Sequence, residues 1–177
     1  ALGYTGGVVT AVDFSFRNFQ HTELRALDIA ADYERSFSSL GKFRFYAIGT
    51  YNKSLSRTLV PGQASIEYVD RSGGVLKWRG NFGVTWDKGQ WQAGWNAQYY
   101  HSLWVYGVGA TPIAITNAVL NQGAARIPSQ VYHDVFLRYR FTATPPFGGV
   151  MLANTDVMLG VQNVFDKRPP VVATPTT

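Results

Sequence analysis

The 177-residue chain contains no cysteine, which excludes both a disulfide framework and a thiolate metal site. A zinc site would depend on three histidines and the carboxylates, and no histidine shows a ligand spacing such as Glu-x-x-His. Charged residues make up only 15% of the chain, which is low for a soluble protein. The net charge of +5 is scattered and forms no basic stripe, so nucleic-acid binding is not expected.

Long apolar runs are also missing. No segment approaches the roughly 20 apolar residues of a membrane helix, and the first residues lack the basic and apolar segments of a signal peptide. A membrane role would therefore need β-strands. Aromatic residues, at 15%, and 18 glycines are abundant, and this composition favours an aromatic-rich β protein.

Apolar and polar residues alternate in several segments, as expected for strands with one apolar face. The clearest pair covers residues 76–86 and 91–99, and the turn Asp87-Lys88-Gly89 between them predicts a hairpin. Further strands are predicted at residues 12–16, 22–35, 43–51, 131–141 and 157–161, which makes about seven. Residues 113–120 fit a short helix and a short strand equally well.

The connections alternate between short and long, which is typical of outer-membrane barrels with tight periplasmic turns and longer external loops. Gly41 and residues 87–89 should then lie on the periplasmic side, and residues 54–74, 106–129 and 166–170 outside. Trp78 and Trp86 share one face about 20 Å apart in membrane height, so they should mark the two interfaces, with Trp91 joining the periplasmic one. The opposite face suits a wet lumen, since it carries Asp28, Asp32, Glu34, Lys77, Arg79, Arg138 and Arg140.

Residues 163–170 read Asn-Val-Phe-Asp-Lys-Arg-Pro-Pro and follow an alternating segment that the two prolines stop. This run resembles the N-L-F-D-K signature of TonB-dependent outer-membrane receptors, found at the end of their penultimate barrel strand. Residues 126–129 with 132–141, and residues 41–51, resemble further segments of the same receptors. The resemblance therefore covers nearly the whole chain.

This resemblance implies an all-β fold, an antiparallel transmembrane β-barrel of 22 strands in the outer membrane of a Gram-negative bacterium. Residues 1–177 would supply strands fifteen to twenty-one, and the plug domain with its TonB box and the final strand would lie elsewhere in a longer protein. Such receptors bind a scarce nutrient, for example a ferric siderophore, cobalamin or an oligosaccharide. They import it with energy from TonB, ExbB and ExbD acting on the plug, and no cofactor or covalent chemistry is expected.

Candidate ligand-binding residues are rings and cations in the external loops or on the lumenal face near them. Rings would suit sugars and cations would suit anionic chelates, although packing within the loops accounts for the same residues. The candidates are Tyr68, Arg71, Lys77, Arg79, Tyr106 and Arg126.

Two other functions fit part of the pattern. A soluble β-sandwich could bind carbohydrate through Trp78, Trp91 and Trp95. A barrel enzyme would need a nucleophile and a base, but the neighbours His133 and Asp134 should point to opposite faces of a strand. We therefore expect no enzyme activity.

Overall fold

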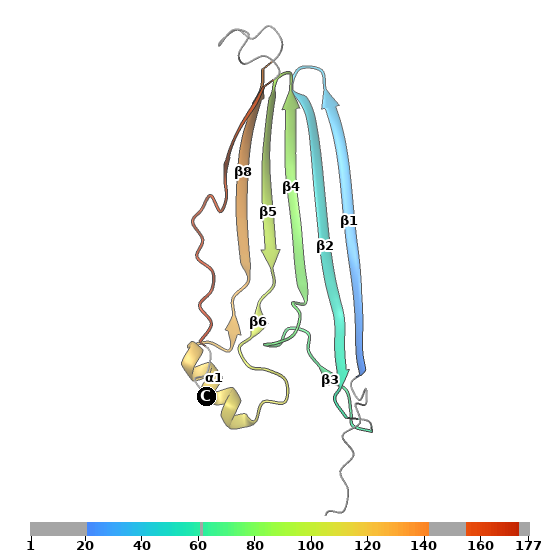
Figure 1. Ribbon diagram of the computed structural model, residues 1–177, viewed down its shortest axis with the longest axis vertical. Helices are drawn as coiled ribbons and strands as arrows, with labels where there is room; N and C mark the ends of the chain where they lie inside the picture. Colours follow the sequence, from blue (N-terminus) through green and yellow to red (C-terminus); the bar gives the residue numbers. More distant parts are fainter. Residues whose placement is uncertain (1–20, 61, 142–154, 174–177) are drawn as a thin grey trace, which may run out of the picture.

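The computed structural model describes residues 21–60, 62–141 and 155–173. Most of them form one antiparallel sheet in the order β1-β2-β4-β5-β8-β9, so each long strand pairs with the next long strand along the chain (Figure 1). The bounds are His21–Phe37 (β1), Gly41–Thr58 (β2), Trp78–Lys88 (β4), Trp91–Tyr100 (β5), Gln130–Arg140 (β8) and Asp156–Val161 (β9). The prediction of an all-β chain is thus confirmed.

Three short strands complete the set. Ile66–Glu67 (β3) pairs with β2, while Leu103–Trp104 (β6) pairs with Arg126–Ile127 (β7) in a separate two-stranded sheet. The sequence pattern did not indicate these, because two residues show no periodicity. The strand predicted at residues 12–16 and the turn at residues 145–149 lie outside the described residues.

β2 continues seven residues beyond the predicted end at residue 51. Its register with β1 shifts between Arg25 and Ala26, where Arg25 pairs with Ser54 and Ala26 with Asn52. Lys53 is therefore the additional residue of a β-bulge. A bulge reverses the alternation of the two faces, which is why the periodic pattern appeared to stop there.

Residues 113–120, which fitted a helix and a strand equally well, are helical. The helix α1 covers Pro112–Gln122, and Thr111 is its N-cap, with Oγ1 accepting a hydrogen bond from the Ala114 amide at 3.2 Å. Gly123 ends the helix with a left-handed φ of 74°. The Thr-Pro start and the glycine end are sequence signals for a helix, and they carry more information here than hydrophobic periodicity.

The long sheet has two distinct ends (Figure 1). At one end, which we call the turn end, β1 is joined to β2 and β4 to β5 by tight turns. At the other, the loop end, lie the long connections 59–77 and 101–129 and the segment after β9. Gly41 and residues 87–89 thus lie at one end, and the described residues of 54–74, 106–129 and 166–170 at the other. The assignment of these ends to the periplasmic and external sides remains a prediction.

Gly41 is required where the two tight turns meet. It has a φ of +93°, and a Cβ at this position would lie 2.4 Å from the carbonyl oxygen of Asp87. A larger residue would force the β1–β2 turn away from β4. This close approach aligns the first two hairpins at the turn end.

The strand register sorts the side chains into two faces. The apolar face carries large side chains from all six long strands, and the polar face carries the charged and amide side chains. Residues of the apolar face include Leu27, Ile29, Phe45, Ala47, Phe82, Val84, Trp95, Val135, Leu137 and Leu159. Residues of the polar face include Asp28, Asp32, Arg44, Tyr46, Asn81, Asn96, Gln98, Asp134 and Arg138.

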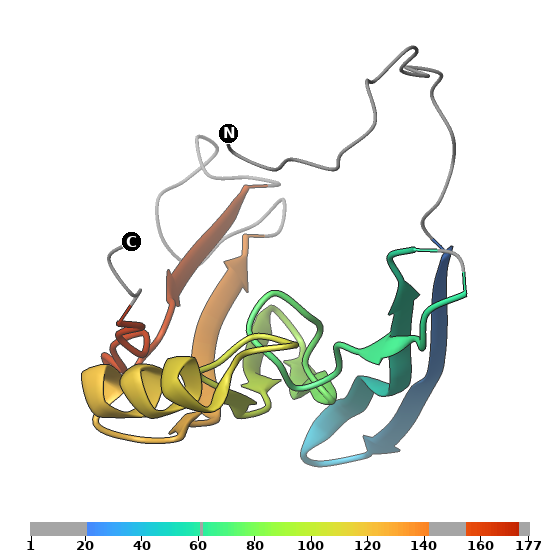
Figure 2. The same cartoon turned by 90° about the horizontal axis from the view of Figure 1, so that it is seen from below.

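No second layer covers the apolar face within the described residues. Leu27 is 55% exposed and Leu159 is 72% exposed, and no large side chain in the described part of the chain is fully buried. The strands follow an arc, with β1 and β9 at its two ends (Figure 2). Among the described residues, no helix has the length and apolar character that crossing a membrane requires.

Candidate functional site

Arg126 is the centre of a cluster of side chains at the loop end. Its Nη2 donates to Asp70 Oδ2 and to the Ser102 carbonyl oxygen, both at 2.9 Å, and its Nε donates to Ser102 Oγ at 3.1 Å. The guanidinium also lies 4.6 Å from the centre of the Trp104 ring. Because Asp70 is in the connection 59–77 and Arg126 in the connection 101–129, this cluster fastens the two long connections to each other.

The backbone strengthens the same junction. The Trp104 amide donates to the Asp70 carbonyl oxygen at 2.9 Å, and the Ser72 amide donates to the Tyr106 carbonyl oxygen at 3.3 Å. Asp70 has a positive φ of 62°, which aspartate tolerates better than most residues. The two connections are therefore one ordered unit at this point.

Arg71 and Tyr106 lie beside this cluster. The Arg71 guanidinium is 5.1 Å from the centre of the Tyr106 ring and 5.8 Å from that of Trp104, and the two rings are 5.4 Å apart. Arg71 has no ion pair with any residue that the structure describes. Three of the six predicted ligand residues, Arg71, Tyr106 and Arg126, are thus brought together, but Arg126 is already engaged by Asp70.

Tyr68 packs elsewhere, and Lys77 borders this group only through its main-chain amide, which donates to Asp70 Oδ1 at 3.4 Å. The guanidinium of Arg57 covers the Tyr68 ring at 4.6 Å, beside β3. The main chain of Lys77 accepts from the Asn52 amide at 2.9 Å, just before β4 begins. Tyr68 therefore packs against the sheet.

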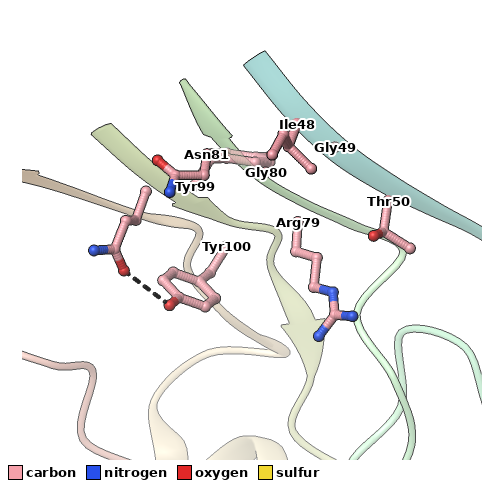
Figure 3. A pocket seen from close by; sticks show the side chains of 9 residues that line it. Ile48, Gly49, Thr50, Arg79, Gly80, Asn81, Tyr99 and Tyr100 are labelled. Atoms are coloured by element: carbon pink, nitrogen blue, oxygen red, sulfur yellow. Dashed lines mark hydrogen bonds between the residues drawn. The ribbon is translucent and has the colours of Figure 1, made fainter. Parts of the chain in front are cut away.

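Arg79 occupies a hollow on the polar face (Figure 3). The hollow has a volume of about 320 Å³ and is lined by residues of β2, β4 and β5. Arg79 lies opposite Thr50 on one side and Tyr100 on the other. Within the described residues its guanidinium makes no hydrogen bond or ion pair, so it is a cation available to a ligand.

Other side chains around this hollow are paired. Tyr100 Oη donates to Gln98 Oε1 at 3.2 Å, and Thr50 Oγ1 donates to Asp28 at 2.7 Å (Figure 3 shows the first of these). Nearer the turn end, Arg44 Nε donates to Asp32 at 2.9 Å, and Tyr46 Oη donates to Asn96 at 2.9 Å. Arg79 is the charged side chain of this lining, and it has no partner among the described side chains.

The tryptophans predicted to mark the interfaces all lie on the apolar face. Trp78, at the loop end of β4, packs on Tyr51 with ring centres 4.5 Å apart. At the turn end, Trp86 Nε1 donates to the Leu40 carbonyl oxygen at 2.7 Å, and the Trp91 ring lies 4.6 Å from that of Tyr139. The apolar face thus has aromatic residues at both ends.

The run 163–170 closes β9 and attaches it to β8. Asn163 has a φ of +50°, and its side-chain amide makes two hydrogen bonds of 3.0 Å to the main chain of Lys167. The main-chain amide of Asn163 donates to Asp134 Oδ1 at 2.8 Å, and the Phe165 ring lies 5.0 Å from the His133 ring. Asparagine suits this position because it both tolerates the left-handed backbone and bonds to the turn.

His133 and Asp134 point to opposite faces, as predicted. The His133 ring stacks on Trp95 at 5.6 Å on the apolar face, whereas Asp134 accepts from Gln98 Nε2 at 3.2 Å on the polar face. The residues that the structure describes contain no group of three or more histidine or acidic side chains able to hold a metal ion.

Three residues of the loop-end cluster were not predicted: Asp70, Ser102 and Trp104. Asp70 precedes Arg-Ser-Gly-Gly and has the composition of a turn. The sequence contains no signal that its carboxylate meets Arg126, which is 56 residues away.

Comparison with models of protein families, with curated proteins and with solved structures found no match to this chain.

Proposed function

We propose that this chain is part of the wall of a transmembrane β-barrel in the outer membrane of a Gram-negative bacterium. The observation that carries the proposal is the continuous apolar face over six strands, where large side chains such as Phe82, Leu27 and Leu159 are 42%, 55% and 72% exposed. A soluble protein rarely leaves such a surface uncovered. Lipid chains would cover it, and the charged face would line a lumen filled with water.

Two further features support a barrel. Aromatic residues lie at both ends of the apolar face, as in the girdles at the two membrane interfaces. Tight turns at one end and long connections at the other match the periplasmic and external sides of such barrels. The outer edges of β1 and β9 have no partner among the described residues, and neighbouring strands of a larger barrel would pair with them.

A soluble β-sandwich is less compatible with this geometry. It needs a second sheet against the apolar face. Within the described residues, the only other sheet consists of the two-residue strands β6 and β7. The apolar area that they offer is far too small for this purpose.

The barrel that we propose is a nutrient receptor of the TonB-dependent class and has no enzymatic role. One support is the resemblance of residues 163–170. The other is the ordered loop end, where Arg71 lies beside the Tyr106 ring and Arg79 lies beside Tyr100, each without an ion pair among the described residues. The loop end would bind a ferric siderophore, cobalamin or an oligosaccharide from outside. Import would use TonB, ExbB and ExbD, acting through a plug domain outside this chain.

Labelling the two faces tests the barrel. Ala47 and Ile48 are exposed neighbours near the middle of β2, on the apolar and polar faces respectively. Since the chain has no cysteine, Ala47→Cys and Ile48→Cys each place a bimane fluorophore at one site. In the full-length protein in vesicles, lipids with brominated chains should quench the label at position 47 strongly and that at position 48 weakly.

Equal quenching at the two positions, or none at either, would overturn the membrane barrel. The label at position 48 is an informative control because isoleucine is more apolar than alanine. Residue hydrophobicity alone would therefore predict stronger quenching at position 48 than at position 47. The receptor class is tested separately, by uptake of labelled iron chelates, cobalamin and oligosaccharides in cells with and without TonB. Uptake that does not depend on TonB would contradict it.

A further inference from the structure

A second hollow lies at the loop end, beyond the ends of β5 and β8, and Tyr100 lines both this hollow and the one around Arg79. Its volume is about 240 Å³. Four separate segments build it, and most of their side chains are apolar or aromatic. The wall includes Leu76, Tyr100, Leu103, Ile127, Tyr132 and Pro170.

Gln130, the first residue of β8, also lines this hollow and is only 8% exposed. Its Nε2 donates to the Pro128 carbonyl oxygen at 3.4 Å, so the remaining polar atom of the side chain is the acceptor Oε1. Oε1 is buried and has no hydrogen-bond partner among the described residues. Buried acceptors are nearly always paired in folded proteins, and a rotation of the Gln130 amide toward the hollow that it lines would let an occupant supply the missing donor.

We infer that this hollow is a binding subsite for a single aromatic ring that carries a hydroxyl group. A cavity of about 150 Å³ is enough for a benzene ring, so this hollow accommodates one ring and little more. The rings of Tyr100 and Tyr132, 6.1 Å apart at an angle of 71°, offer edge and face contacts to it. The hydroxyl group would donate to Gln130 Oε1.

The charges around the hollow favour a neutral donor over an ammonium group. No carboxylate lines the hollow. His101, which does line it, is held through Nδ1 by the hydroxyl of Tyr99 at 2.8 Å, and its Nε2 lies 3.8 Å from the Asp70 carboxylate. Because Asp70 is already paired with Arg126 at 2.9 Å, an ammonium group would find no free counter-charge here, whereas a phenolic hydroxyl needs only the amide oxygen.

The wall that contains Pro170 is fixed without a ligand. Gln122, at the end of α1, donates from Nε2 to the Val171 carbonyl oxygen at 2.8 Å, and its Oε1 accepts from the Ala173 amide at 2.7 Å. Both atoms of one side-chain amide thus hold the segment that follows Pro170. The subsite is therefore preorganised, which lowers the entropic cost of binding.

The test uses 19F NMR titrations of the full-length protein in detergent with two probes, 4-fluorophenol and 4-fluoroanisole. 4-Fluorophenol has a hydroxyl group that can donate a hydrogen bond to Gln130 Oε1, whereas 4-fluoroanisole carries a methyl group in place of the hydroxyl hydrogen. We expect 4-fluorophenol to bind about tenfold more tightly, the ratio expected when an acceptor is left unpaired. In Gln130→Leu, which keeps the volume but removes the acceptor, the ratio should fall below about twofold.

Gln122→Leu is the matched variant, since it releases the wall at Pro170 but leaves Gln130 in place. It should weaken both probes by a similar factor and keep their ratio. Equal affinity of the two probes in the unaltered protein would overturn the subsite. So would an absence of binding, because an ordered water molecule alone would then satisfy Gln130.

This subsite extends the proposed receptor function, because it names the chemistry of one ligand group at the loop end. The two proposals fail separately. If the bimane labels show no membrane face but 4-fluorophenol still depends on Gln130, the barrel is wrong and the subsite remains. If the labels behave as expected and the probes do not discriminate, only the subsite is lost.

Discussion

The polar face differs between its two halves. In the turn half, between Tyr46 and the tight turns, cations are paired with carboxylates across neighbouring strands. These pairs are Arg44 with Asp32, Lys42 with Glu34, and Arg138 and Arg140 with Asp156. In the loop half, Arg79 and the amide oxygen of Gln130 have no partner among the described residues.

Glycines are used differently in the two halves. In the turn half, the Phe136 ring lies over Gly94, and the Tyr46 ring lies over Gly83. In the loop half, Gly49 and Gly80 pair with Ile29 and Tyr99 and therefore belong to the apolar face. The turn half also has a hollow, of about 390 Å³ and lined by Asp32, Arg44 and Tyr46, but its charges are paired. The loop half differs in keeping unused hydrogen-bonding groups beside its hollows, as a ligand site requires.

Gly94→Ala should have the largest effect. A Cβ at position 94 would lie 2.1 Å from Phe136 Cε1, so the ring would have to move, and we expect a loss of about 1–3 kcal/mol. The measurement is the free energy of unfolding in urea. Gly49→Ala is the control, because its Cβ would meet only the Arg79 carbonyl oxygen at 3.7 Å. Similar losses in the two variants would show that contact with the Phe136 ring is not what limits position 94.

Arg126→Ala should have an intermediate and local effect. It removes three hydrogen bonds and leaves the Asp70 carboxylate, whose side chain is 16% exposed, without its cation. We expect a local cost of about 1–2 kcal/mol, seen as roughly 5- to 30-fold faster hydrogen exchange at the Ser72 and Trp104 amides. Arg138→Ala, in the turn half, should leave both exchange rates unchanged. Unchanged exchange in Arg126→Ala would show that the backbone alone joins the two connections.

Arg79→Gln should have the smallest effect on stability. Because the guanidinium makes no described contact, the free energy of unfolding should stay within about 0.5 kcal/mol of the unaltered protein. Arg44→Gln removes the pair with Asp32 and should lower the urea midpoint measurably. A loss clearly above about 0.5 kcal/mol in Arg79→Gln would mean that Arg79 has a structural partner, and the contrast between the halves would fail.

The sequence predicted the sheet well where alternation is strict. Residues 76–86 and 91–99 form the predicted hairpin, and Trp78, Trp86 and Trp91 share the predicted face. Period-two patterns are reliable here because one face is apolar along the whole strand, so a shift of register by one residue would exchange the faces. The interface role of these tryptophans remains a prediction.

The candidate site was predicted only in part. Arg79 follows from its place on a strand, whereas the Asp70–Arg126 contact depends on how two long connections fold back on each other. Gln130 has no distinguishing sequence feature, since a buried amide and an exposed one look alike. Lys53 shows the same limit within a strand, because a bulge depends on pairing with a partner strand.

The order of the strands also bears on how this sheet assembles. Each long strand pairs with the next long strand in the chain, so the sheet can grow by adding one hairpin partner at a time over short chain separations. Each addition covers one edge and exposes another of the same kind. Strand pairing alone therefore supplies no stopping point, and in the barrel that we propose the number of strands would be fixed by the step that joins the two outer edges.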